Sequence, residues 1–289
     1  MDHIPFKFAE AVAQTIDRSH CSVIHLEGAP LWTAAFANNA ERHPIRVNLT
    51  KCGATWKHCF ENEEPGQGSN SKMSLDELKK FPKLKDVRIA SIVISDKREG
   101  FEDVQPLKID FQQLFKFIRS YSQSVHLDLF STVSSSEADL ELVRELEKYN
   151  YNKVFVREYS PMFENLVRKN METASISLQS SNWSEESSEP LRNLVKSSKF
   201  RDISFLPTQP FTFEEFEELF DKMSPTRKLL KSTIERSAAE KVRNFRKQQM
   251  EGVIKRGTCE AFRWRLEDNV RITGALYGGA SFELFYEKL

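Results

Sequence analysis

Glycine, cysteine and long apolar runs are all scarce in this chain of 289 residues. Its ten glycines leave little material for a phosphate-binding loop, and neither a Walker loop nor a dinucleotide-binding glycine fingerprint occurs. The four cysteines are too few and too scattered for a disulfide framework, which favours a reducing compartment. No run approaches the length of about 18 apolar residues that an ordinary transmembrane helix needs.

Net charge is absent as well, because 42 basic residues balance 42 acidic ones. The protein therefore has no global field that would attract nucleic acid or an acidic membrane. The N-terminal stretch MDHIPFKFAE contains charges and lacks the apolar segment of a secretory signal. The sequence predicts a cytoplasmic or nuclear protein, and its 22 phenylalanines are enough for a real core.

Residues with catalytic or metal-binding chemistry do not form a recognisable motif. The six histidines are dispersed, and no cysteine or serine stands in a nucleophile-elbow sequence. His43, Cys52, His58 and Cys59 come nearest to a metal cluster, but their spacing fits no common zinc pattern. We expect a non-enzymatic protein without metal or cofactor, in which such a cysteine is a reduced thiol in a partly buried strand.

An apolar pair followed by a cation recurs through the middle of the chain. The copies are Leu114-Phe115-Lys116, Leu142-Val143-Arg144, Leu166-Val167-Arg168 and Leu194-Val195-Lys196. Each copy lies in a segment with apolar residues at helical spacing, and its cation falls on the side that faces water. Self-similarity of this kind is typical of repeat proteins.

A short segment with the alternation of a β-strand follows each of these helical segments. The strand segments are 124–130, 153–159, 173–179 and 202–206. A helical stretch at 75–81 followed by 87–95 is an upstream, longer-spaced copy. The pattern thus predicts five helix–strand units at a period of about 20–36 residues. No single unit can cover its own apolar faces, so the units must stack with their strands parallel.

The predicted fold class is α/β: a leucine-rich-repeat-like helix–strand solenoid with parallel strands, a small helical N-terminal segment, and a C-terminal helix plus antiparallel β-ribbon. The strict leucine-rich consensus is absent, so an ordinary parallel α/β sheet is the rival. A solenoid face usually binds another macromolecule, although the repeat can equally serve only to build a core. The candidate partner-binding residues, chosen from strand alternation alone, are His126, Asp128, Arg157, Ser175 and Ser177. Alternation does not decide which strand face is exposed.

Composition suggests where the parts of the chain begin and end. Residues 62–73 are rich in Gly, Ser and acid and predict a flexible linker between an N-terminal segment, 1–61, and the repeat region, 74–209. Within the N-terminal segment, residues 46–62 alternate as a strand or hairpin would. Residues 210–289 are expected to form a C-terminal cap of helices and a β-ribbon, with Gly274 and Gly278 at turns or bulges.

Two helices of opposite charge are predicted in this cap. Thr212 and Glu215 form a capping box that starts an acidic helix over 212–225. A basic helix over about 226–254 follows, with its buried side at Leu230, Ile234, Ala238, Val242, Phe245 and Gln249. The ten cations of this region could neutralise phosphates. Nucleic acid that binds at residues 227–256 is therefore the alternative partner. The other interpretation is a charged outer face that pairs with the acidic helix.

The N-terminal sequence MDHIPFKFAEAVAQTI, followed after a gap by LWTAAFANNAER, resembles the opening of a nematode-expanded family of F-box-like proteins. Members start with Met-Asp, a Val/Ile-Pro pair, an aromatic-rich helix and later a Leu-Trp segment. The resemblance covers residues 1–42 and extends loosely into the repeats. The matching residues are Met1, Asp2, Ile4, Pro5, Phe6, Phe8, Val12, Leu31 and Trp32.

What this resemblance implies is a substrate-recruiting subunit of a cullin-type ubiquitin ligase. It implies that a Skp-type adaptor is one partner and an unknown substrate protein the other. It also places Pro5, Phe6, Phe8 and Leu31 at the adaptor contact. The residues by themselves allow a different interpretation, in which Phe8, Val12 and Ile16 only cover the open apolar end of the solenoid.

Overall fold

The computed structural model divides into two compact units, residues 1–130 with 135–151 (unit 1) and residues 131–134 with 152–289 (unit 2). The residues that the structure describes are 6–13, 30–40, 42–53, 55–63, 72–80, 87–96, 110–122, 125–130, 136–157, 160–171, 174–179, 189, 192–196, 201–207, 209–225, 228–267, 269–278 and 280–289.

Four strands of unit 1 lie in the order β2-β1-β3-β4. β1 and β2 form an antiparallel hairpin, which confirms the alternation at 46–62, and Gly53 at its turn has a left-handed φ of 63°. β1 pairs with β3 and β3 pairs with β4, both in parallel. The bounds are β1 (His43–Cys52), β2 (Thr55–Asn62), β3 (Val87–Asp96) and β4 (Val125–Leu129).

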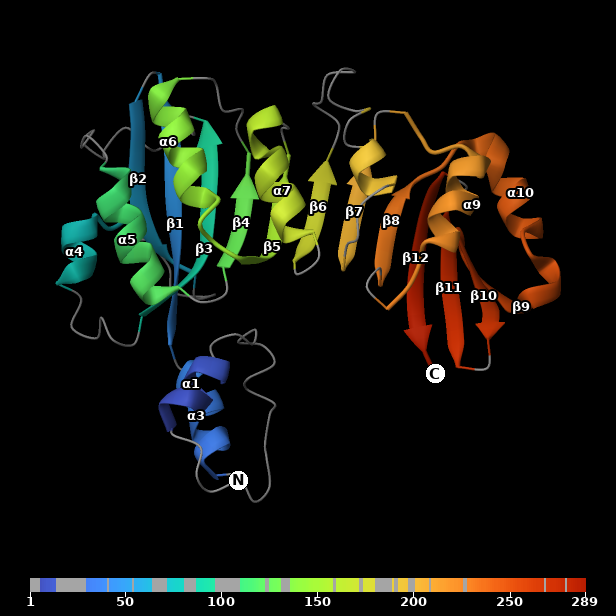
Figure 1. Cartoon of the computed structure of the whole chain (residues 1–289), viewed down its shortest axis with the longest axis horizontal. Helices are drawn as coiled ribbons and strands as arrows, with labels where there is room; N and C mark the ends of the chain where they lie inside the picture. The colour runs from blue at the N-terminus through green and yellow to red at the C-terminus, as the bar shows by residue number, and fades with distance from the viewer. Residues whose placement is uncertain are drawn as a thin grey trace. The chain divides into compact units, whose positions relative to one another are not determined.

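Helices cover one face of these four strands (Figure 1). They are α4 (Leu75–Lys79), α5 (Phe111–Tyr121) and α6 (Glu137–Leu146). α5 begins after Asp110, whose side chain caps the helix, and it buries Phe111, Leu114, Phe115 and Ile118 against the sheet side. The apolar spacing had predicted this stripe, and Lys116 lies exposed as expected.

A buried ion pair joins α6 to the hairpin. The carboxylate of Asp139 is fully buried and accepts hydrogen bonds from Nε1 of Trp56, at 2.8 Å, and from Nζ of Lys51, at 2.6 Å. Both donors lie on the helix-facing side of the hairpin. Because a buried carboxylate must have partners to remain ionised, this contact ties the position of α6 to that of β1 and β2.

Unit 2 continues with parallel strands and ends with antiparallel ones. β5 starts at the unit boundary, and the order is β5-β6-β7-β8-β12-β11-β10-β9. The first four of these strands pair in parallel and the remaining contacts are antiparallel. The bounds are β5 (Tyr151–Val156), β6 (Ser175–Gln179), β7 (Asp202–Leu206), β8 (Leu229–Thr233), β9 (Met250–Arg256), β10 (Cys259–Glu267), β11 (Val270–Tyr277) and β12 (Ser281–Lys288).

The helical segments of unit 2 alternate with these strands along the chain. They are η2 (Pro161–Phe163), α7 (Glu164–Asn170), residues 192–196, α9 (Phe213–Asp221), η3 (Arg236–Ala238), α10 (Ala239–Asn244) and η4 (Lys247–Gln249). The predicted capping box of Thr212 and Glu215 is present at the start of α9. All five predicted helix–strand pairs, from α4–β3 to 192–196 and β7, are confirmed, and with them the α/β class with its consecutive parallel strands.

The predicted basic helix over 226–254 is wrong. This region folds as β8, η3, α10, η4 and β9 in succession. The predicted buried positions are nevertheless buried from Leu230 to Phe245, while Gln249 is exposed. A spacing of four residues keeps side chains on one face of a helix and also on one face of a strand, since four is a multiple of two. The pattern alone therefore could not separate the two structures.

Gly274 also differs from its prediction, because it lies inside β11 and makes no turn or bulge. It stands under the indole of Trp264, and a Cβ at Gly274 would lie 2.5 Å from Cζ3 of that ring. Trp264 is fully buried and donates its Nε1–H to the carbonyl of Phe245 at 2.9 Å. The absence of a side chain at position 274 therefore makes room for the indole, whereas Gly278, with a φ of 60°, does form a turn.

Substitution of Gly274 by alanine is expected to destabilise the protein by about 1–3 kcal/mol, because the added methyl group must displace a packed ring. Gly252→Ala is the matched control, since a Cβ there would meet nothing within 4 Å. Its effect should stay within about 0.5 kcal/mol. Urea unfolding followed by tryptophan fluorescence measures both. Equal effects of the two substitutions would contradict the packing of Trp264 on Gly274.

Candidate functional site

Burial alternates along β4 of unit 1 and along most strands of unit 2, whereas β1 and β3 are buried on both faces over much of their length, with Asn48, Ser91 and Val93 buried on the face away from the helices. In β4, Val125, Leu127 and Leu129 are buried, whereas His126 and Asp128 between them are half-buried on the other face. The register pairs His126 with Ser91 of β3 and Asp128 with Val93. The two predicted candidates of unit 1 therefore share the face that α5 and α6 do not cover (Figure 1).

The same face of unit 1 carries a group of interacting polar side chains. Oε1 of Glu63 accepts hydrogen bonds from Nε of Arg46, at 2.8 Å, and from the hydroxyl of Ser91, at 2.5 Å. His126, as the register neighbour of Ser91, lies beside this group. The sequence prediction included His126 but missed Arg46, Glu63 and Ser91, because only the strand register brings these residues together.

Cys59 lies on this face of β2 and is buried. Nδ2 of Asn48 lies 3.9 Å from its Sγ, and Glu61 is also near. Burial, with a smaller effect of Glu61, raises the pKa of the thiol to about 11. Such a thiol stays protonated at neutral pH and is a poor nucleophile, so Cys59 is a reduced, buried cysteine as expected.

In unit 2 the open face runs across all eight strands as two rows of register partners. We call these rows the open strand face of unit 2. The first row is Lys153, Ser175, Asp202, Leu229, Phe285, Thr273, Arg263 and Gly252. The second row is Phe155, Ser177, Ser204, Lys231, Glu283, Ala275, Ala261 and Ile254.

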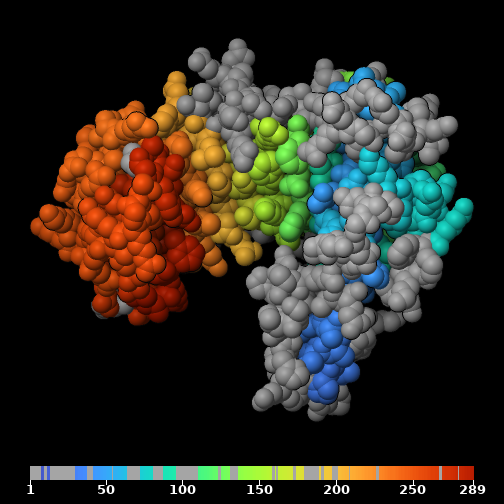
Figure 2. All heavy atoms as spheres, turned by 180° about the vertical axis from the view of Figure 1, so that it is seen from behind, coloured from blue at the N-terminus to red at the C-terminus, as the bar shows by residue number. Residues whose placement is uncertain are grey.

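Most of these side chains are half-buried or exposed. Ser175 and Ser177 are half-buried, and Arg157, which follows β5, is exposed. Figure 2 views the molecule from behind, and side chains from β6 to β8 (yellow to orange) reach the surface there. Residues of the same strands that point the other way, such as Ile176, Leu178 and Ile203, are buried on the helix side. Ser175 and Ser177 thus lie on the open side of β6, whereas Arg157 is exposed just beyond the end of β5.

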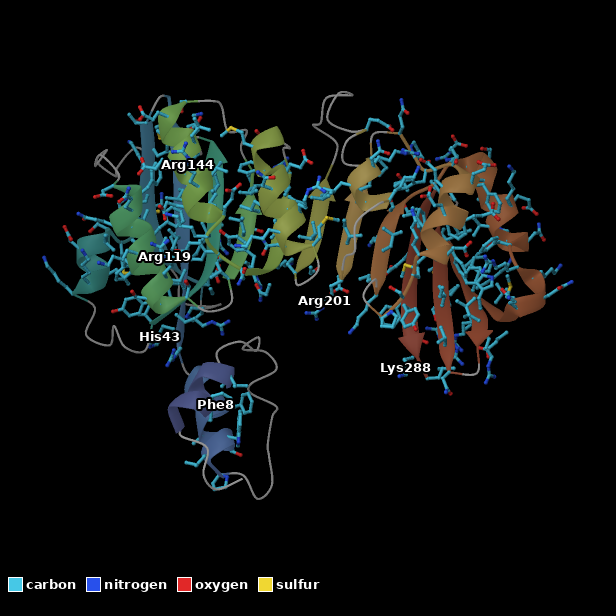
Figure 3. The ribbon with its side chains drawn as sticks, in the orientation of Figure 1. Phe8, His43, Arg119, Arg144, Arg201 and Lys288 are labelled. Atoms are coloured by element: carbon cyan, nitrogen blue, oxygen red, sulfur yellow. The ribbon has the colours of Figure 1, made fainter. Side chains whose placement is uncertain are left out.

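The N-terminal helices α1 (Phe6–Ala13) and α3 (Pro30–Ala40) pack on each other through Ala9, Ala13, Ala35 and Phe36. Phe8, which the alternative interpretation expected to cover the open end of the solenoid, is not part of this buried face. Phe8 is instead 54% exposed and Leu31 43% exposed. The ring of Phe8, labelled in Figure 3, contacts Trp32 edge-on, with a centroid distance of 6.3 Å.

Of the four residues predicted at an adaptor contact, Phe8 and Leu31 are therefore accessible apolar side chains. Pro5 lies outside the described residues, and Phe6 begins α1, although its side chain is not among those described. Ile16 also lies outside the described residues. Exposed apolar side chains on a small helix pair are a feature of protein interfaces.

The cations of residues 227–256 do not form one basic face, since several are paired with acids. Lys241 pairs with Glu214 and Arg246 with Asp221, and both acids belong to α9. Arg243 pairs with Glu260 at 2.7 Å. The expected pairing between this region and the acidic helix is therefore present. It leaves fewer free positive charges to bind a nucleic-acid phosphate backbone than the sequence implied. Arg227 lies outside the described residues.

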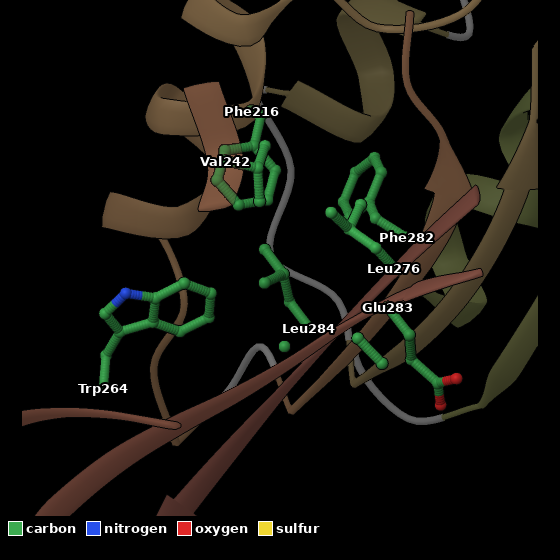
Figure 4. Close-up of a pocket in the computed structure, with 9 residues that line it drawn as sticks. Phe216, Val242, Trp264, Leu276, Phe282, Glu283 and Leu284 are labelled. Atoms are coloured by element: carbon green, nitrogen blue, oxygen red, sulfur yellow. The ribbon is translucent and has the colours of Figure 1, made fainter. Parts of the chain in front are cut away.

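A small pocket lies in the described part of unit 2, between α9, α10 and the antiparallel strands (Figure 4). Phe216, Val242, Trp264, Phe282 and Leu284 converge on it, whereas the carboxylate of Glu283 points away. The lining is apolar and too tight for a water molecule, which makes it core packing and not a ligand site.

The described residues offer neither a metal site nor a membrane-spanning helix. They hold no group of three or more His, Cys, Asp or Glu side chains placed to bind a metal ion. None of the helices in the described ranges is long and apolar enough to cross a membrane.

Comparisons with known proteins give little guidance. No protein-family model matches the chain, and no curated protein matches it. A solved structure, the MycE methyltransferase from the mycinamycin biosynthetic pathway in complex with Mg and SAH, is similar at 9% identity and a TM-score of 0.24. The match covers 99% of this chain and 93% of that one. A TM-score this low carries no inference about fold or activity.

Native alkylation provides a test of the Cys59 environment. A pKa of about 11 leaves roughly a hundredfold less thiolate at pH 8 than an ordinary thiol has. Because it is buried and its thiol stays protonated, Cys59 should react with iodoacetamide much more slowly than the half-buried Cys52 and Cys259. Mass spectrometry of the digested protein resolves the individual cysteines. All should react alike in denaturant, and equal labelling in the native protein would contradict the assigned burial.

Proposed function

We propose that this chain is a non-enzymatic protein-interaction scaffold that recruits a substrate protein to a cullin-type ubiquitin ligase. The helix–strand units serve as a leucine-rich-repeat-like solenoid whose open strand faces bind the substrate. The helix pair α1–α3 serves as an F-box-like segment that binds a Skp-type adaptor. The adaptor part of this proposal comes from the resemblance at residues 1–42, and the scaffold part comes from the sheet.

The observation that carries the scaffold role is that, among the described residues, helices cover only one face of the strands of unit 2. In unit 2 the covered residues Ile176, Leu178 and Ile203 are buried, whereas their neighbours Ser175 and Ser177 are half-buried. If the strands served only to build a core, both of their faces would be apolar and buried. Polar residues on a broad, uncovered strand face are typical of the binding surfaces of repeat proteins.

The accessibility of Phe8 and Leu31 supports the adaptor role. Each is a large apolar side chain that leaves close to half of its surface in water. Ala9 and Ala13, not these residues, hold α1 against α3. Substitution of Phe8 or Leu31 should thus affect a partner more than the fold. The alternative interpretation, in which Phe8 covers the open end of the solenoid, would require this side chain to be buried.

Binding to a purified Skp-type adaptor tests the proposal. The wild-type chain should bind the adaptor, and a Phe8→Asp, Leu31→Asp double variant should bind about tenfold or more weakly, since apolar anchors dominate such interfaces. Ala37→Asp is the matched control, because Ala37 is also exposed on α3 and has no predicted role in the contact. Isothermal titration calorimetry measures the affinities, and circular dichroism confirms that the variants remain folded.

Failure of the wild-type chain to bind the adaptor would refute the ligase role and leave the scaffold role to be tested alone. Equal weakening by Ala37→Asp and by the double variant would show that the contact does not involve Phe8 and Leu31.

A further inference from the structure

The strand β9 forms one end of the strand order and pairs only with β10. Residues 251–256 are exposed along their whole length, and the apolar side chains of Val253 and Ile254 are 45% and 41% exposed. No strand lies beyond β9 in the described part of the chain. The outer backbone N–H and C=O groups of such an edge are available to an added strand.

The register gives this edge a definite pattern of side chains. Gly252 is opposite Arg263, Ile254 is opposite Ala261, and Arg256 is opposite Cys259. Because facing residues of an antiparallel pair share a face, Arg263, Ile254 and Arg256 all project from the same side of the sheet. Val253 and Lys255 project from the other side, so the edge presents apolar side chains on both faces.

Because Gly252 has no side chain, no side chain of β9 covers Arg263 at this position. A Cβ at Gly252 would meet nothing within 4 Å, so the space directly above position 252, opposite Arg263, is open. Strands lie about 4.8 Å apart, so an added strand lies about 9.6 Å from β10, a distance that an extended arginine and an extended glutamate side chain span together. Arg263 is exposed, and neither it nor Arg256 forms an ion pair with a described residue. Two unpaired cations therefore flank Ile254 along this edge.

We propose that β9 binds an extended segment of a partner protein by strand addition, and that this segment carries two acidic residues four positions apart with apolar residues between them. In the antiparallel arrangement, one acid lies opposite Arg256 and the other opposite Gly252, where Arg263 reaches it. The apolar residues lie opposite Ile254 and Val253. Backbone hydrogen bonds supply the affinity, and the two arginines select the acidic pattern. This inference does not depend on the adaptor role.

A second copy of the chain fits this edge poorly. Self-pairing centred on Ile254 would set Arg256 of one copy opposite Gly252 of the other, next to the second Arg263. Self-pairing centred on Val253 would set Glu251 opposite Lys255. Glu251, however, already pairs with Arg271 at 3.0 Å and with Arg265 at 3.5 Å, and it lies at a register shift of the ladder. The cations thus oppose self-association and favour an acidic partner.

Fluorescence anisotropy with the full-length chain tests the proposal. The probe is a fluorescein-labelled peptide of sequence TETVVET, in which the two Glu residues take the positions opposite Arg256 and Gly252. The peptide TKTVVKT reverses its charge, and TETVPET removes a backbone donor. We expect binding of TETVVET that weakens with added salt, and clearly weaker binding of both control peptides.

Substitutions in the protein assign the contact. Arg263→Ala and Arg256→Ala should each weaken the binding of TETVVET about two- to fivefold, in line with exposed charge pairs. Arg144→Ala is the matched control, since Arg144 is an exposed cation of α6 in unit 1 (Figure 3), and it should leave binding unchanged. Hydrogen exchange should show that the peptide slows exchange of the amides of residues 252–255.

Several outcomes would overturn the proposal. These are no binding of TETVVET, equal binding of TKTVVKT, or equal weakening by Arg144→Ala. Tighter binding of a single-stranded oligonucleotide at the same arginines would assign them to nucleic acid instead. Sedimentation of the free chain as a dimer that Ile254→Lys dissociates would assign the edge to self-association.

Discussion

The structure depends on the way in which parallel strands must be connected. A parallel pair needs a crossover segment between its strands, and here each crossover contributes a helix with one apolar stripe. The helices bury these stripes on one face of the strands, as α5 does with Phe115 and Ile118 and α7 with Leu166 and Val167. In unit 2 the other face receives no helix from the described chain, and its side chains are partly exposed and many are polar. In unit 1 several side chains of that face, such as Cys59 and Val93, are buried. The proposed scaffold role follows from this one-sided covering.

The C-terminal end of the sheet is closed by aromatic packing. Phe216, Phe220, Phe245 and Trp264 contact one another mostly edge-to-face, with centroid distances of 5.0 to 6.2 Å, and Phe282 packs on Phe216 at 5.4 Å. This cluster holds α9 and the segment before η4 on the antiparallel strands, and Gly274 provides its floor. The change from parallel to antiparallel pairing leaves β9 as an outer strand, which is the basis of the proposed strand addition.

The repeat could be predicted from the sequence because its helices and strands have different apolar periods, as α5 and β4 show. The structure of residues 226–254 could not be predicted in this way. Leu230, Ile234, Ala238 and Val242 are spaced four residues apart, which fits the period of a helix and also that of a strand. The candidates His126 and Asp128 were found by alternation within a single strand. Glu63 and Ser91, however, meet only because the strand register brings them together, and the same holds for Arg263 and Gly252, which face each other across β10 and β9. Neither relation is visible in a linear pattern. For α1, two alanines form the buried face, and no large apolar residue marks it.

Cysteine scanning along β6 and β7 tests the one-sided covering most directly. In a background without native cysteines, single cysteines at Ser175, Ser177 and Ser204 sample the open strand face, and those at Ile176, Leu178 and Ile203 sample the covered one. The account predicts rapid alkylation of the folded protein at the three serine positions and alkylation at least about tenfold slower at the three apolar positions. Equal rates on both faces, or slower reaction at the serine positions, would show that the serine face is covered and would contradict the account.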